Sequence, residues 1–133
     1  MIEIPANLRE LFEEKITCAL ATIMPNGQPQ VTPVWVDLED GYVCVNTAEG
    51  RQKARNLKVG SKLTVLLIHP QNDHYWIEVR GHVEQILGEK EGGRDHINRL
   101  SRKYTGKEYG GPADQIRLKY KIAPDKINSE DRR

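Results

Sequence analysis

The chain has 133 residues, the size of one ordinary domain, which is long enough to bury a core without a disulfide or a metal. Its 20 Lys and Arg residues nearly balance its 19 Asp and Glu residues, so the charge gives no reason to expect nucleic acid as a partner. Its apolar stretches are too short to cross a bilayer. We therefore expect one domain over residues 1–133 that binds neither nucleic acid nor a membrane.

The two cysteines and the first residues predict the compartment. Cys18 and Cys44 lie inside apolar runs, where each is most simply a small buried hydrophobe. They do not form a disulfide framework, which indicates a reducing environment. The opening Met-Ile-Glu-Ile-Pro lacks the basic and apolar regions of a signal peptide. These features predict a cytoplasmic protein.

The first half of the chain predicts one helix followed by three strands joined by tight turns. Apolar residues recur at helical spacing over residues 5–15. Asn26-Gly27 and Asp40-Gly41 are strong hairpin signals. Pro29 and Pro33 cannot donate a backbone hydrogen bond, so their strand is expected at a sheet edge or at a bulge. The expected strands cover residues 16–24, 28–38 and 42–47.

The second half predicts two helices and three strands. A short helix over residues 51–59 is expected to end at Gly60, and a long strand over 74–87 to bend at Gly81. Residues 115–123 alternate apolar and polar side chains, as in a strand with one buried and one solvated face. The remaining elements are a strand over 62–69, a helix over 89–104 and a polar, frayed tail over 125–133.

The order of these elements predicts the fold class. Short hairpins join the early strands, and few strand–helix–strand units occur. The chain shows no internal repeat and no linker. This arrangement of six strands predicts a mainly β fold, an antiparallel barrel with peripheral helices.

Familiar catalytic constellations are absent from the sequence. There is no Gly-x-Ser-x-Gly elbow and no phosphate-binding lysine loop. Neither cysteine has a neighbouring base in the sequence. The four histidines do not show the spacing of metal ligands, so no metal site is expected: His69, His74, His82 and His96. An enzyme of this kind would take its chemistry from a cofactor.

The most informative segment is basic and follows a strand. Arg51, Lys53, Arg55 and Lys58 come directly after Gly50, at the start of the predicted short helix. Cations beside unpaired backbone N–H groups would bind a phosphate or a similar small anion. On a helix, Arg51, Arg55 and Lys58 would share one face, and Lys53 would point elsewhere. The alternative is a solvated basic helix.

Six segments, taken in order, closely resemble the pyridoxamine 5′-phosphate oxidase-like split-barrel superfamily. More narrowly, they resemble its small flavin- or deazaflavin-dependent oxidoreductases. The resemblance covers nearly the whole chain, and the order and spacing of the segments carry it. The segments are Pro29–Trp35, Asn46-Thr47, Arg51–Leu57, Val79–Val83, Leu100–Tyr109 and Arg117–Pro124.

The resemblance implies a six-stranded antiparallel split barrel that forms a homodimer, with two cofactors at the interface. Arg51 and Lys53 would then bind the cofactor phosphate. Asn46 and Thr47 would form hydrogen bonds to the ring or to the ribityl chain. The ring would be lined by Gln30, Thr32, Pro33, Val34 and Trp35, and the second subunit would contribute His74, Tyr75 and Trp76.

Three of these residues have competing interpretations. Trp35 offers stackable area for a tricyclic ring, but could equally belong to the barrel core. Trp76 could anchor a dimer interface without touching a ligand. Gln30 could be an outward-facing strand residue.

The resemblance implies that the cofactor is the deazaflavin coenzyme F-420 or, as the alternative, FMN. Coenzyme F-420 carries extra carboxylates in its tail, and Arg55, Lys58 and Arg80 could bind them. The leading prediction is an oxidoreductase that uses coenzyme F-420 to transfer a hydride to an unsaturated small-molecule substrate. An FMN-dependent oxidoreductase and a non-catalytic flavin- or deazaflavin-binding protein stay open as alternatives.

Overall fold

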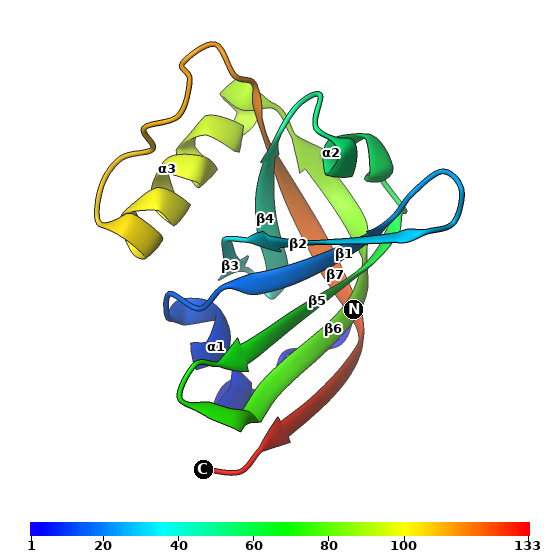
Figure 1. The fold of residues 1–133 in the computed structure, drawn as a ribbon, viewed down its shortest axis with the longest axis vertical. Coiled ribbons are helices and arrows are strands. Elements are labelled where there is room, and N and C mark those ends of the chain that lie inside the picture. Colours follow the sequence, from blue (N-terminus) through cyan, green and yellow to red (C-terminus); the bar gives the residue numbers. More distant parts are fainter.

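The computed structural model describes residues 1–133, which form one seven-stranded antiparallel sheet curled into a split barrel (Figure 1). The strand order is β2-β1-β5-β6-β7-β4-β3. The strands are β1 (Cys18–Ile23), β2 (Pro29–Val34), β3 (Val36–Glu39), β4 (Tyr42–Ala48), β5 (Lys62–His69), β6 (Asn72–Leu87) and β7 (Arg117–Asp131). The helices are α1 (Glu10–Glu13), α2 (Gln52–Asn56) and α3 (Gly93–Thr105), with 3-10 turns η1 (Ala6–Leu8) and η2 (Glu89–Glu91). The predicted mainly β split barrel with peripheral helices is confirmed.

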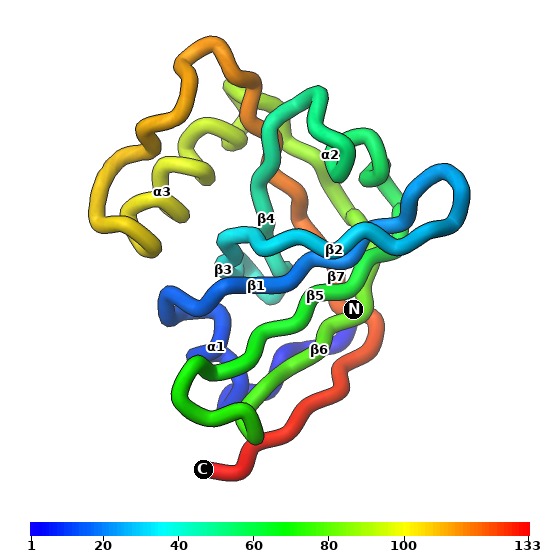
Figure 2. Tube along the Cα trace, in the orientation of Figure 1, coloured from blue at the N-terminus to red at the C-terminus, as the bar shows by residue number.

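The count of six strands is wrong because the strand expected over residues 28–38 divides at Trp35. Its first half, β2, pairs with β1, and its second half, β3, pairs with β4. These two halves are the opposite edges of the sheet, so the chain crosses the split of the barrel at Trp35 (Figure 2). The edge position expected from Pro29 and Pro33 is confirmed, because β2 pairs on one side only.

The C-terminal residues form a strand, which corrects the predicted frayed tail. β7 continues to Asp131 and pairs with β6 from Lys119 to Asp131, for example Asn128 with Glu78. β6 has 16 residues, so it offers backbone partners far beyond the apolar part of β7. Ile127 also packs against the core. The composition of this polar stretch does not reveal that a long neighbouring strand will pair with it.

The short basic helix is shorter than predicted. α2 ends at Asn56, and Leu57 is extended and buried against the core. Gly60 lies in a turn with a φ of +91°, and its N–H bonds to the Val83 carbonyl instead of capping a helix. Lys58 therefore lies outside α2, and the predicted cationic face of Arg51, Arg55 and Lys58 does not form.

The other two helices also differ in length from the prediction. The first helical region divides into η1 and α1, and α3 begins at Gly93 rather than at residue 89. Gly106, with a φ of +78°, ends α3 in the left-handed conformation that suits glycine. No helix of the structure combines the length and the apolar character that crossing a bilayer would need.

The core fills the barrel, and α3 covers the barrel's outside next to β4 and β7 (Figure 1). Inward-facing residues such as Val65, Ile77 and Ile122 are fully buried. The face of β7 that was predicted to be solvated is covered as well, because α3 packs on it. Arg117 and Lys119 are therefore only 4% and 5% exposed.

Candidate functional site

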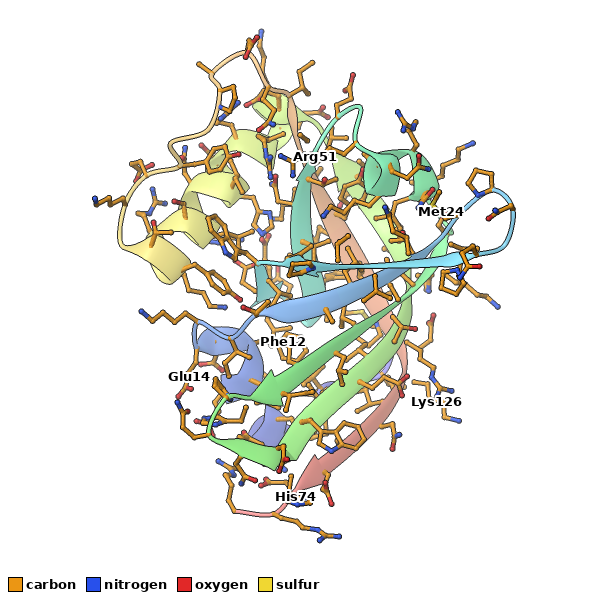
Figure 3. All side chains as sticks on the ribbon, in the orientation of Figure 1. Phe12, Glu14, Met24, Arg51, His74 and Lys126 are labelled. Atoms are coloured by element: carbon orange, nitrogen blue, oxygen red, sulfur yellow. The ribbon has the colours of Figure 1, made fainter.

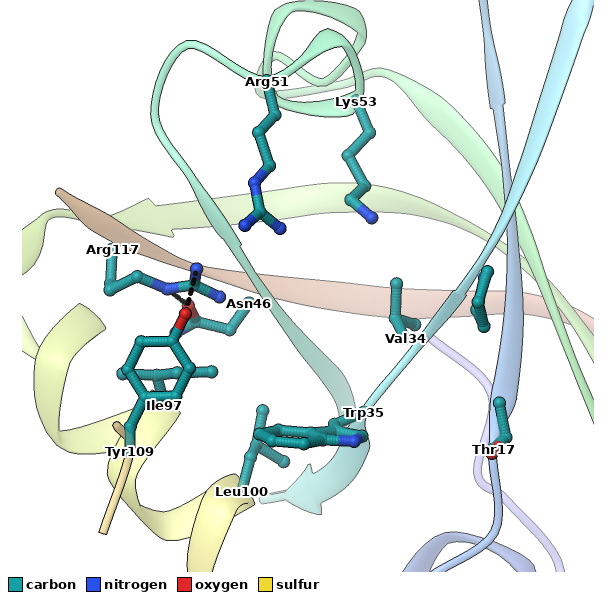
Figure 4. A pocket seen from close by; sticks show the side chains of 11 residues that line it. Thr17, Val34, Trp35, Asn46, Arg51, Lys53, Ile97, Leu100, Tyr109 and Arg117 are labelled. Carbon is teal, nitrogen blue, oxygen red and sulfur yellow. Dashed lines mark hydrogen bonds between the residues drawn. The ribbon is translucent and has the colours of Figure 1, made fainter. Parts of the chain in front are cut away.

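A pocket of about 340 Å³ lies at the split of the barrel, between the β2–β3 junction, β4, the start of α2 and α3 (Figure 4). Strands from both edges and a covering helix thus meet around one space. The residues that line it are Thr17, Pro33, Val34, Trp35, Asn46, Arg51, Lys53, Ile97, Leu100, Tyr109 and Arg117.

Three cations line the pocket, and no carboxylate does. Arg51 and Lys53 point into it from α2 and the turn before it, and Arg117 reaches it from the start of β7 (Figure 4). None of the three forms an ion pair, although most other arginines of the chain do. Burial, followed by the positive charges of Arg51 and Arg117, lowers the pKa of Lys53. Cations that repel one another in a partly desolvated pocket favour an anionic ligand.

Arg117 is held in place by neutral groups. Its Nε donates to Asn46 Oδ1 at 2.9 Å, and one terminal nitrogen donates to Gln115 Oε1 at 2.9 Å. The guanidinium carbon lies 5.0 Å from the centre of the Tyr109 ring. Burial lowers the pKa of Arg117. The side chain is therefore oriented while no carboxylate contacts its guanidinium, which leaves the guanidinium able to bind an anion.

Asn46 and Thr47 face opposite sides of β4. The Asn46 amide donates to Gly93 O at 2.9 Å and lies 3.1 Å from His96 Nδ1, so its polar atoms are already engaged within the protein. Asn46 lines the pocket next to Arg117. Thr47 is 2% exposed, its Oγ1 has no hydrogen-bond partner, and it does not line the pocket.

An aromatic and apolar wall faces the cations. Trp35 stacks on Tyr104 with ring centroids 5.4 Å apart and an interplanar angle of 12°. Tyr104 is itself fixed, because its hydroxyl donates to Ile16 O at 2.7 Å. Leu100 of α3 lies beside Trp35 (Figure 4). Trp35 thus lines the pocket and packs on Tyr104 of α3 rather than within the barrel core, and its contact with a cofactor ring stays a prediction.

Thr32 and Gln30 support the pocket without lining it. Lys53 Nζ donates to Thr32 Oγ1 at 3.1 Å, which directs the ammonium toward the barrel split. Gln30 lies between Thr22 and Asn56, whose amide nitrogen is 3.4 Å from Gln30 Oε1. Gln30 faces inward, so its interpretation as an outward-facing residue is wrong.

Arg55 lies outside the pocket. Its guanidinium donates to Gly50 O and to Gln52 Oε1, both at 2.9 Å, and so folds back on the turn that carries it. The structure therefore separates Arg55 from Arg51 and Lys53.

The three residues expected from a second subunit lie near the start of β6. His74 is far from Arg51, which lines the pocket of the same chain (Figure 3). His74 is exposed, with its Nδ1 3.3 Å from Glu130 Oε1. Trp76 faces the outside of the sheet and donates to the same carboxylate at 3.1 Å. Tyr75 is 1% exposed, and its hydroxyl donates to Asn7 O at 2.7 Å within the core. Tyr75 therefore has no surface to offer a ligand.

Sequence reasoning missed four residues that the fold brings to the pocket. Arg117 was placed on a solvated face, and nothing local signals that α3 will cover it. The segment that carries Tyr109 belongs to the resemblance, but no pattern in the sequence singles out this tyrosine as a pocket residue. Ile97 and Leu100 read simply as the apolar face of a helix.

The family model of pyridoxamine 5′-phosphate oxidase matches residues 4–130. The chain belongs to this family. The predicted resemblance is thereby confirmed, and the fold is that of the flavin-binding oxidoreductases within it.

Several solved structures have the same fold as this chain. An F-420 reductase is 28% identical with a TM-score of 0.83, over 94% of this chain and 98% of that one. A conserved hypothetical protein from Mycobacterium tuberculosis is 23% identical with a TM-score of 0.78, over 98% and 86%. General Stress Protein 26 from Bacillus anthracis is 22% identical with a TM-score of 0.71, over 95% and 92%. No curated protein matches the chain at a significant level.

Proposed function

We propose that the protein is an oxidoreductase that binds coenzyme F-420 in the pocket at the barrel split and reduces an unsaturated small-molecule substrate. The observation that carries this proposal is the group of three cations without a carboxylate, Arg51, Lys53 and Arg117, opposite a stacked aromatic wall. A phosphate joined to a planar ring system matches both halves of the pocket. The 28% identity to an F-420 reductase over nearly the whole chain supports the deazaflavin over FMN.

The cations suit the phosphate group. Arg51 presents a planar fork of donors that can bind two phosphate oxygens, and Lys53 adds a point charge beside it. Each charge-assisted hydrogen bond contributes roughly 1.5–3 kcal/mol. α2 has only five residues, so these side chains, rather than a helix dipole, carry the attraction.

The apolar wall suits the ring. Trp35 is held against Tyr104 and offers its other face and edge to the pocket, while Val34 and Leu100 exclude water from it. When bound, the reduced deazaflavin supplies the hydride. The residues of this chain orient the ring and keep the site dry. None of them is assigned as a proton donor, and solvent can fill that role.

We further propose a homodimer formed through the outer face of β1, β2 and β5. Val31 and Ile68 on this face are 63% and 44% exposed, and Ala19 and Leu66 lie between them. Thr17 and Pro33 border both this apolar face and the cation-lined pocket. A second copy on the face would therefore also cover the open side of the pocket.

Titration of the purified, cofactor-free protein with coenzyme F-420 and, separately, with FMN tests the proposal through ligand fluorescence. We expect a clear preference for coenzyme F-420 and a dimer in sedimentation equilibrium. A preference for FMN would assign the flavin to this pocket instead. Binding of neither ligand would refute the cofactor site. Tight binding without turnover of a broad panel of unsaturated acceptors would favour a carrier protein over an enzyme.

A further inference from the structure

Beyond the pocket, a continuous chain of buried polar contacts leads from Arg117 to the surface. Arg117 Nε lies 2.9 Å from Asn46 Oδ1, Asn46 Nδ2 lies 3.1 Å from His96 Nδ1, and His96 Nε2 lies 2.9 Å from Asp37 Oδ1. These residues come from β7, β4, α3 and β3. The His96 side chain is 0% exposed. Water therefore does not compete for its ring nitrogens.

The Gly93 carbonyl sets the direction of every hydrogen bond in this chain. A carbonyl oxygen only accepts, so the Asn46 atom at 2.9 Å from it is the amide nitrogen. The same nitrogen faces His96 Nδ1, which must then be an unprotonated acceptor. The His96 proton consequently resides on Nε2 and is donated to Asp37. The remaining Asn46 atom, Oδ1, faces Arg117 and accepts from it.

A second protonation of His96 is incompatible with this arrangement. A proton on Nδ1 would point at the Asn46 NH₂ group, which is also a donor. Rotating the amide would place oxygen against the Gly93 carbonyl and nitrogen against Arg117 Nε. The first contact would bring two acceptors together, and the second would bring two donors together. The network thus has one satisfied state, in which His96 is neutral.

The charged groups around His96 shift its pKa in opposite directions. Burial lowers its pKa, and the hydrogen bond and charge of Asp37 oppose this without reversing it. Arg99 on α3 and Lys119 on β7 add to the lowering. Glu39 binds both of these cations and so moderates them. The electrostatic balance agrees with the neutral imidazole that the hydrogen bonds require.

β4 contributes the thiol of Cys44, whose pKa burial raises to about 12, so it stays neutral. At the Arg117 end of the network, the titratable neighbours are Tyr109, Arg51, Arg94 and Glu89. His96 has a folded-state pKa below its ordinary value of 6.5. The stability that the neutral network contributes is therefore fully present above pH 6.5 and declines as the pH falls from 6.5 through the lower folded-state pKa, where His96 takes up a proton and the order of the network is lost.

We propose that His96 is a positioning residue that, in its neutral form, fixes the Arg117 guanidinium in the anion pocket through Asn46. The proposal rests on the proposed function only in treating the pocket as an anion site. It makes anion affinity depend on the protonation of a histidine that does not line the pocket.

The first test uses the ligand-free protein. ¹⁵N NMR should show His96 as the Nε2–H tautomer, with a titration below that of an ordinary histidine. The Nε–H resonance of Arg117 should be protected from exchange. Its protection should fall in His96→Leu, which removes the Nδ1 acceptor of one Asn46 amide hydrogen and leaves that amide held by the Gly93 carbonyl alone. It should persist in His96→Asn, whose Oδ1 can stand where Nδ1 stood. An Nδ1–H tautomer, or an Arg117 resonance unchanged in His96→Leu, would overturn the proposal.

The second test measures FMN affinity between about pH 5 and 8, where a histidine titrates. At neutral pH we expect His96→Leu to raise the dissociation constant by about tenfold, the loss of one charge-assisted contact, and His96→Asn to change it little. The wild-type affinity should fall with pH more steeply than that of His96→Asn. FMN's own phosphate titration affects both proteins equally, so it cancels from the comparison.

The matched control is His82→Asn. This histidine bonds only to Asp125 and Glu84 on the surface, so its pH profile should follow the wild type. Identical pH profiles of FMN affinity for the wild type and His96→Asn would refute the proposed positioning of Arg117 by His96. If His96→Leu does not fold, the His96 tautomer in the wild type and the pH profile of FMN affinity in His96→Asn still test the proposal. If neither FMN nor coenzyme F-420 binds, the proposed function fails, while the NMR measurement still tests the positioning of Arg117 by His96.

Discussion

The two ends of β7 differ in how their charged side chains are paired. At its start, Arg117 is buried beside Arg51 and Lys53 without any carboxylate in the pocket. At its end, Asp131 is held by Arg133 at 2.8 Å, and Arg133 also binds Glu10 at 2.5 Å. The second arrangement is complete in itself and joins the C terminus to α1. The first lacks its negative partner. Within one strand, the end with balanced charge stabilises the structure, and the end with unbalanced charge is where we propose an anionic ligand.

The largest expected effect follows from removing the unbalanced charge. Arg51→Ala combined with Lys53→Ala should raise the cofactor dissociation constant by at least about a hundredfold, since two charge-assisted contacts of roughly 1.5 kcal/mol or more are lost. Neither residue forms an ion pair, so the melting temperature of the ligand-free protein should hardly change. Fluorescence titration and thermal unfolding measure both.

The matched control for that pair is Arg55→Ala. Arg55 belongs to the same short helix but bonds only to its own turn. Its loss should leave the affinity within about twofold of the wild type, less than the contribution of one weak contact. Equal losses in Arg55→Ala and in the double variant would contradict the phosphate assignment.

Arg117→Met should separate binding from stability. We expect an affinity loss of about tenfold for one charge-assisted contact. The ligand-free protein should lose little stability, because the substitution also removes a buried charge that forms no ion pair. Chemical denaturation and cofactor titration on the same preparation check this. A large loss of stability with unchanged affinity would make Arg117 a structural residue like those at the far end of β7.

Asp131→Asn should have the reverse signature. Hydrogen bonds from Arg133 and Asn7 lower the pKa of Asp131 from its ordinary 3.8 to about 2. Its contribution to stability is therefore fully present above about pH 3.8 and is lost as the pH falls toward 2. The variant should be less stable at neutral pH and less sensitive to acid over that interval, with cofactor affinity unchanged. A change in affinity would show that the two ends of β7 are not independent.

The smallest effect is expected at Thr47. Its Oγ1 is buried without a partner, so Thr47→Val should keep the shape of the side chain and raise the stability by up to about 1 kcal/mol. Cofactor affinity should not change, because Thr47 does not line the pocket. Reduced affinity would instead support the contact with the ring or ribityl chain expected from the sequence.

Local patterns in the sequence were sufficient for most of the strands. Alternation, tight-turn dipeptides and prolines predicted β1, β4, β5 and β6 and the edge position of β2, because each depends on neighbouring residues or on a property of proline itself. The basic segment that carries Arg51 and Lys53 was equally visible, as a run of cations after Gly50. Helix length was less predictable, since α2 ends where Leu57 turns into the core.

The sequence by itself therefore determined the β class, the family resemblance and two of the three pocket cations. Only the tertiary structure decided that the chain breaks at Trp35, that β7 extends to Asp131, and that Arg117 joins Arg51 under the cover of α3. The reason is distance along the chain. Arg117 and Asn46 are 71 residues apart, and whether a charged residue ends in solvent or in a pocket depends on which distant element packs over it.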